Sequence, residues 1–96
     1  MAALPFDANY KWQHGSMTSG RRTPEGNAAV GGVANSWHLS GDAFDLDGPN
    51  LNALLREAQA KYPNAKAFIH DGHVHVQQRG LGVPYYGKNG TKGLRR

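Results

Sequence analysis

Five histidines and no cysteine in a chain of 96 residues define the metal chemistry open to this protein. Thiolate zinc sites of the finger type and cysteine nucleophiles are excluded, so imidazole and carboxylate groups would have to hold any metal. A hydrolytic zinc site needs three protein ligands and an open position for water, whose pKa the ion lowers. His38 and Asp45 are two candidate ligands, because their spacing allows a histidine just before a strand and a carboxylate within it to converge.

Three further histidines belong to a predicted β-hairpin. Residues 67–70 and 73–77 form its strands, and Asp71-Gly72 is the turn between them, because both central positions of such a turn need positive φ. Directly opposed residues of an antiparallel pair share a face. The pairing therefore places the histidines on the face toward a cleft and the apolar residues on the face toward the core. The histidines are His70, His73 and His75, and the apolar residues are Ile69, Val74 and Val76.

The hairpin offers two candidates for the third metal ligand, His73 and His75. We favour His75, because it lies deeper in the strand, whereas His73 flanks the turn. With His75 on the metal, His70 and His73 lie on the same face and are available for proton transfer.

Helical and extended segments are expected to position these residues. Apolar residues recur at helical spacing from residue 49 to about residue 62, with a proline in the first turn. A shorter helix begins after Thr23, a suitable N-cap, and ends at the glycines 31–32. Residues 16–19 and 43–46 are predicted strands. The expected fold class is α+β: a small antiparallel sheet with one main helix and a short second helix, and a zinc site on the open face of the sheet.

The length of the chain suits a single domain over residues 1–96, ending in a basic, glycine-rich tail from about residue 80. The formal charge is +4, and much of the excess lies after residue 78. The basic residues there are Arg79, Lys88, Lys92, Arg95 and Arg96. Such a tail is either a solvated surface segment or a region attracted to a polyanion such as cell-wall polymer, nucleic acid or a membrane surface.

Nothing in the sequence predicts insertion into a membrane. No segment has the apolar length of a transmembrane helix. The first thirteen residues, MAALPFDANYKWQ, lack the basic start and the sustained apolar stretch of a secretory signal. We therefore expect a protein that is made in the cytoplasm and stays there unless something else releases it.

One ten-residue motif carries a resemblance to a known family. Residues 36–45 read S-x-H-x-x-G-x-A-x-D. This motif resembles that of zinc D-Ala-D-Ala carboxypeptidases and related phage endolysin peptidases, which cut peptidoglycan stem peptides. Residues 18–24 and 27–32 are similar to the family's approach to the motif, and residues 73–76 resemble its closing H-x-H segment. The likeness covers roughly residues 15 to 80.

The resemblance implies roles for individual residues. The zinc ligands would be His38, Asp45 and a histidine of the last strand, best matched by His75. Arg22 would bind a carboxylate or carbonyl oxygen of the substrate, which suits a planar and permanently charged guanidinium. Ser36 would support the metal loop by hydrogen bonding.

The general base departs from the family pattern. Many relatives carry an acidic residue three positions before the last zinc ligand, where this chain has Gly72. Another group must then accept the proton that water loses during attack. His70 matches a position where some members carry a catalytic histidine, and His73 lies on the same predicted face. If His73 were the ligand, His70 would occupy the position of the base.

The leading hypothesis is a zinc metallopeptidase that hydrolyses peptidoglycan stem peptides or cross-links, either endolysin-like or as a D,D-carboxypeptidase. By analogy with phage lysins, it would act on the bacterial wall after release, as a monomer, with the tail bound to anionic wall or outer-membrane polymer. The alternative is a non-catalytic, zinc-stabilised module that binds the cell wall. Charge alone suggests a nucleic-acid binder or nuclease, but no basic helix or aromatic-interleaved strand supports a nucleic-acid partner.

Overall fold

The computed structural model describes residues 5–87 and residue 90. Most of the basic residues of the expected tail, namely Lys88, Lys92, Arg95 and Arg96, lie outside these described residues. No helix in the described part of the chain is long and apolar enough to cross a membrane.

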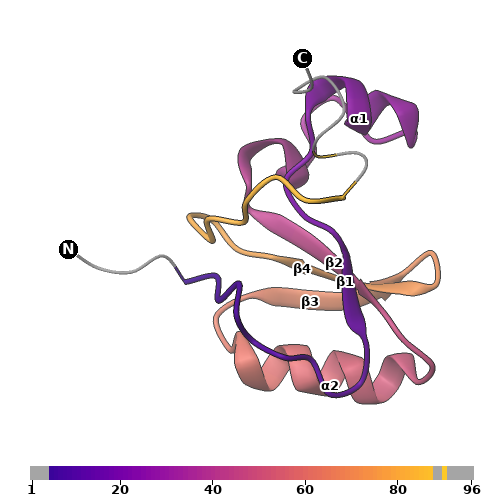
Figure 1. The fold of residues 1–96 in the computed structure, drawn as a ribbon, viewed down its shortest axis with the longest axis vertical. Helices are drawn as coiled ribbons and strands as arrows, with labels where there is room; N and C mark the ends of the chain where they lie inside the picture. The colour runs from indigo at the N-terminus through magenta and orange to yellow at the C-terminus, as the bar shows by residue number, and fades with distance from the viewer. Residues whose placement is uncertain (1–4, 88–89, 91–96) are drawn as a thin grey trace.

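Four antiparallel strands form a single sheet in the order β1-β2-β4-β3 (Figure 1). They are β1 (Ser16–Ser19), β2 (Ala43–Asp47), β3 (Lys66–His70) and β4 (His73–Gln77). Together with one main helix and one short helix, this sheet confirms the α+β class expected from the sequence.

The main helix, α2 (Leu51–Lys61), covers one face of the sheet (Figure 1). Side chains alternate along each strand, so every second residue of β2 and β4 points toward this helix. The buried core consists of Phe44, Leu46, Val74 and Val76 from the strands, Leu54, Ala58 and Tyr62 from the helical side, and Leu81 and Val83 from the segment after β4. The intervening residues of the same two strands point to the opposite face, and Asp45 and His75 are among them.

The helix begins later than the sequence pattern indicated. Pro49 was expected in its first turn, but Asn50 is the N-cap and the helix starts at Leu51. The Asn50 side chain accepts a hydrogen bond from the backbone N–H of Ala53 over 3.1 Å. Asparagine is among the best N-cap residues because its side-chain oxygen satisfies one of the free N–H groups of the first turn. Pro49 therefore precedes the helix.

The hairpin has the predicted register, with His70 opposite His73 and Phe68 opposite His75. Its turn residues Asp71 and Gly72 have φ values of 50° and 77°, as a two-residue turn of this type requires. One expectation was wrong: Ile69 was assigned to the core but is 41% exposed. It lies one residue from the turn on β3, which is the edge strand of the sheet in the described part of the chain and pairs with β4 alone.

Two short helical segments lie beyond the face of the sheet that α2 leaves free. The first, α1 (Pro24–Ala29), has Thr23 as its N-cap, as predicted, with Thr23 Oγ1 accepting from the N–H of Gly26. The second is a 3-10 helix, η1 (Trp37–Ser40), which ends at Gly41 with a φ of 77°. The N–H of Arg22 donates to the carbonyl of His38 over 3.0 Å, which ties the start of one segment to the other.

Candidate metal centre

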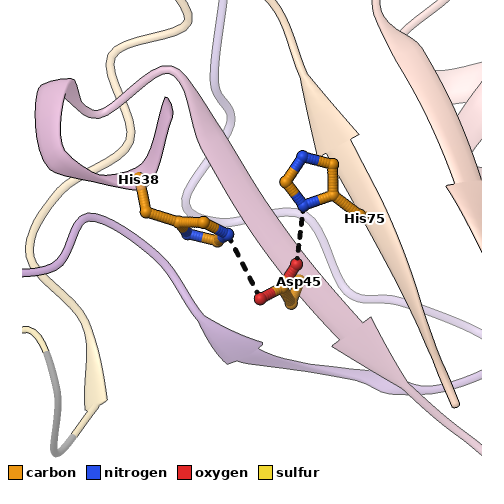
Figure 2. Close-up of side chains that lie close together, drawn as sticks. All are labelled: His38, Asp45 and His75. Carbon is orange, nitrogen blue, oxygen red and sulfur yellow. Dashed lines mark hydrogen bonds and ion pairs between the residues drawn. The ribbon is translucent and has the colours of Figure 1, made fainter. Parts of the chain in front are cut away.

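Three side chains from three different elements meet on the face of the sheet opposite α2. His38 lies in η1, Asp45 in β2 and His75 in β4, and the Asp45 carboxylate points between the two imidazole rings (Figure 2). One possible ligand atom from each residue lies within 4.8 Å of the other two. The backbone explains the pairing, because Asp45 and His75 are directly opposed in the antiparallel β2–β4 ladder.

Capping of the 3-10 helix holds His38 in place. Ser36 is its N-cap, and Ser36 Oγ accepts from the backbone N–H of His38 over 3.2 Å. The imidazole is buried, with Nδ1 2.8 Å from the carbonyl oxygen of Gly20. A carbonyl can only accept, so Nδ1 carries the proton and donates it to Gly20. The other nitrogen, Nε2, faces Asp45 Oδ2 at 3.3 Å.

His75 has a similar arrangement on the other side of the carboxylate. Its Nδ1 lies 3.0 Å from Asp45 Oδ1, and its Nε2 lies 2.8 Å from the side-chain oxygen of Gln77. An amide oxygen accepts, so Nε2 donates to Gln77 and leaves Nδ1 directed at Asp45. The two imidazole rings approach each other edge to face, with their centroids 5.3 Å apart.

Asp45 is a buried carboxylate between cationic and proton-bearing groups. Its exposed fraction is 3%, and burial alone would raise its pKa. Hydrogen bonds from His38 and His75 and the charges of His38 and His73 outweigh burial, so the pKa of Asp45 lies well below its usual range. Asp45 is therefore ionised wherever the protein is folded near neutral pH.

The donor set fits a divalent cation. Gly20 accepts from one nitrogen of His38, and Gln77 accepts from one nitrogen of His75. The other nitrogen of each ring faces a carboxylate oxygen of Asp45 and carries either a proton or a lone pair. A lone pair facing a carboxylate is repulsive unless a proton or a metal ion lies between them. Two imidazoles and one carboxylate form a common ligand set of catalytic zinc, and metal-bound histidines normally donate their other N–H to an oxygen as here.

Arg22 is held at the edge of this group by three hydrogen bonds. Nε donates to Ser19 Oγ over 3.3 Å, and the two terminal nitrogens donate to Asn27 Oδ1 over 3.1 Å and to Asp45 Oδ2 over 3.3 Å. Burial lowers the pKa of Arg22 and the charge of Asp45 partly offsets this, but the guanidinium stays cationic. The side chain is 14% exposed, so its position is fixed while part of it remains accessible.

The two remaining histidines of the hairpin lie at different distances from the centre. His73 Nε2 is 3.6 Å from Asp45 Oδ1, and its side chain is 30% exposed. The His70 side chain is 64% exposed, and its Nε2 lies 3.4 Å from a carboxylate oxygen of Asp71 instead. Of the two residues considered for proton transfer, His73 is therefore the one in contact with the metal-binding group.

All seven residues singled out from the sequence border one cavity of about 460 Å³. They are Arg22, Ser36, His38, Asp45, His70, His73 and His75. The glycine pair at 31–32 and the flanking Val30 and Val33 form another part of the wall.

Three contacts of the centre were not anticipated from the sequence. Gln77 is two residues after His75 on one strand, so the alternation of side chains alone would have placed both on one face. Asn27 lies inside a predicted helix, where asparagine is unfavourable, which signals a side chain with a specific partner. The carbonyl of Gly20 carries no sequence signal, because any residue supplies the same acceptor.

Comparison with known proteins gives one result. A family model described as Peptidase M15 matches residues 10–77, a stretch that contains all seven of these residues. No curated protein and no solved structure matches the chain significantly.

Proposed function

The chain belongs to the peptidase M15 family of zinc-dependent metallopeptidases, and we propose from this premise that it hydrolyses amide bonds in the peptide part of peptidoglycan. The observation that carries the proposal is the meeting of His38, Asp45 and His75 in one cavity with Arg22 and His73. Membership of the family makes the chain a metallopeptidase. The choice of peptidoglycan rests on the likeness of the motif at residues 36–45 to wall-cutting enzymes.

In this proposal zinc would be held by His38, Asp45 and His75. Bound zinc lowers the pKa of water and polarises a carbonyl group. The carbonyl of Gly20 and the amide of Gln77 fix the two imidazoles in the tautomers that such ligation needs.

His73 acts as the proton acceptor in place of the acidic residue that the chain lacks at Gly72. It is the histidine nearest to Asp45 apart from the two ligands, and it is partly exposed to the cavity. An imidazole can take a proton and later return it to the leaving amine. His70, which pairs with Asp71 and is mostly exposed, contributes to the cavity wall.

Arg22 supplies the positive charge for substrate binding. Its hydrogen bonds to Ser19, Asn27 and Asp45 hold the guanidinium rigidly, and it lines the cavity. A preorganised cation stabilises the negative charge that develops on a carbonyl oxygen under attack, and it binds a carboxylate equally well.

Digestion of purified peptidoglycan, with and without a chelator, tests the proposal. Mass analysis of the fragments should show new amine termini only when zinc is present, and the fragment masses identify the bond cut. The His38→Ala variant is expected to lose both bound zinc and activity. Failure to form any product under any metal condition would refute the enzymatic proposal, and bound zinc without product would favour the wall-binding module instead.

A further inference from the structure

A second recess, of about 350 Å³, opens next to the metal centre. It shares Val33, Ser36, His70 and His75 with the larger cavity, so the two hollows meet beside the candidate ligand His75. We call this hollow the side recess. Four residues line it without lining the larger cavity: Asn35, Trp37, Phe68 and Gln77. A group of the substrate that occupied it would lie next to the reacting amide.

The two hollows differ in charge. The larger cavity is lined by Arg22 and by the carboxylates of Asp45 and Asp71. Among the described residues that line the side recess, none carries a carboxylate, an ammonium or a guanidinium group. Its wall combines two aromatic rings with the amides of Asn35 and Gln77, so it suits an uncharged group that has both apolar surface and hydrogen-bonding atoms.

Neighbouring charged side chains hold the ring of Trp37 in place. The guanidinium carbon of Arg79 lies 3.8 Å from the centre of the Trp37 ring, and an Arg79 nitrogen is 3.5 Å from Asp42 Oδ2. Asp42 in turn accepts from the N–H of Gly80 and from the hydroxyl of Ser40. The Trp37 ring is therefore preorganised, because stacking with the guanidinium restricts its orientation before any ligand binds.

The second aromatic ring of the side recess, that of Phe68, packs against the candidate ligand His75. The Phe68 ring lies opposite His75 in the hairpin, and the two ring centroids are 5.0 Å apart. Both Trp37 and Phe68 are only half-buried, so each ring has surface left for contact with a ligand.

We propose that the side recess binds the N-acetylated sugar to which the stem peptide is attached. This inference rests on the proposed function. Alanine residues of the stem carry only a methyl group, which leaves a recess of about 350 Å³ largely empty, and a charged side chain of the stem finds no oppositely charged carboxylate, ammonium or guanidinium group among the residues that line the recess. A sugar ring is uncharged, offers C–H faces to aromatic rings, and presents hydroxyl and acetamido groups to Asn35 and Gln77.

The position of the recess restricts the bond that is cut. An extended chain advances about 3.3–3.6 Å per residue, so a sugar held next to His75 leaves only the first one or two amides of the stem within reach of the metal centre. The enzyme then cleaves near the glycan and not at the far D-Ala end.

Cleavage of paired substrates tests the inference. One substrate is the sugar-linked stem peptide, and the other is the same peptide without sugar. We expect kcat/KM of the intact protein to be about tenfold or more higher for the sugar-linked form, and Phe68→Ala and Asn35→Ala each to remove most of that preference. Ile69→Ala is the matched control, because Ile69 neighbours Phe68 on β3 and points to the other face; it should keep the preference. Equal kcat/KM for both substrates overturns the sugar site and leaves the peptidase proposal intact.

A binding measurement separates the two proposals. The chain contains two tryptophans, so Trp12→Phe leaves Trp37 as the only indole reporter. Titration of this zinc-loaded variant with the free N-acetylated disaccharide should change the Trp37 emission in a saturable way, and Phe68→Ala should weaken the response about tenfold. Saturable binding without cleavage of any substrate supports the recess and refutes the enzyme. An unchanged emission spectrum overturns the sugar site.

Discussion

The hydrogen bond between His75 and Gln77 fixes one of the three candidate metal ligands. Because Gln77 accepts from Nε2 of His75, it sets which nitrogen is left for a metal. We expect Gln77→Leu to weaken zinc binding by about 10–100-fold while the protein stays folded, as measured by competition with a chromophoric chelator.

Gln78 provides the matched control for this prediction. It is the next residue along the chain, and its backbone N–H donates to the carbonyl of Asp42, a contact that does not involve its side chain. Gln78→Leu should leave the zinc affinity unchanged. Equal affinities for wild type and Gln77→Leu would show that the tautomer of His75 is not set by Gln77.

Replacement of the two candidate bases separates their roles. His73→Ala should lower kcat by about 10²–10⁴-fold with zinc still bound, because His73 lies 3.6 Å from Asp45 and is proposed to carry the proton. His70→Ala should change kcat little, since His70 points to Asp71. Steady-state kinetics on a stem-peptide substrate and zinc analysis of both variants check this. Loss of zinc from His73→Ala would instead make His73 a ligand.

At the residue scale, the candidate metal ligands could be predicted from the sequence, but the residues that hold Arg22 in place could not. The spacing and the resemblance of the motif at residues 36–45 paired His38 with Asp45, and the alternation of strand residues restricted the third ligand to the histidine face of the hairpin. The partners of Arg22 could not be found in this way. Asn27 reaches Arg22 from α1, and no local pattern specifies the angle at which that helix packs.

At the scale of elements, Glu57 joins α2 to the segment before β1. Its carboxylate accepts from the N–H groups of Gln13 and His14 and from the hydroxyl of Tyr10. Burial raises the pKa of Glu57, but these hydrogen bonds outweigh burial and the net pKa is lowered. A carboxyl group with a lowered pKa in the folded state contributes stability above its unfolded pKa, and this contribution is lost as the pH falls through the folded value.

Glu57→Gln should therefore destabilise the protein in a pH-dependent way. At pH 7 we expect a loss of about 1–2 kcal/mol in the free energy of unfolding, because a charged acceptor of several hydrogen bonds becomes neutral. Below a pH of about 4 the difference from wild type should shrink as the wild-type carboxylate is protonated. Urea unfolding at several pH values measures this, with Glu25→Gln in α1 as the control. A constant difference across the pH range would contradict the assigned role.

Elements were predictable where a short pattern determines them. Thr23 before Pro24 marked the start of α1, and Asp71-Gly72 marked the hairpin, because both depend on local backbone geometry. The start of α2 and the exposure of Ile69 were misjudged for different reasons. Asn50 caps α2, so Pro49 precedes the helix, and the exposure of Ile69 reflects the edge position of β3 in the sheet, which the pattern of the hairpin does not specify.

At the scale of the whole molecule, the candidate metal centre brings together parts of the chain that lie in different layers of the fold. His38 belongs to the layer of η1 and α1, whereas Asp45 and His75 belong to the sheet. A cation held by all three would link the two layers, and this matters in a chain of 96 residues that has no disulfide. The two imidazoles themselves reach the Asp45 carboxylate through one nitrogen each, at 3.3 Å for His38 and 3.0 Å for His75, and these two contacts depend on protonation.

Zinc should therefore stabilise the folded protein by an amount that grows with the logarithm of its free concentration above Kd. A ligand that binds only the folded state adds about 2.7 kcal/mol at a concentration 100 times its Kd, and in a domain of this size each kcal/mol raises Tm by about 4–8 °C. We expect a rise in Tm of about 10–20 °C between chelator and such a zinc concentration, measured by circular dichroism. His38→Ala should abolish the rise, because it removes the ligand from the η1 layer, whereas His70→Ala should retain it. A zinc-independent Tm in the wild-type protein would mean that the three side chains do not hold the metal.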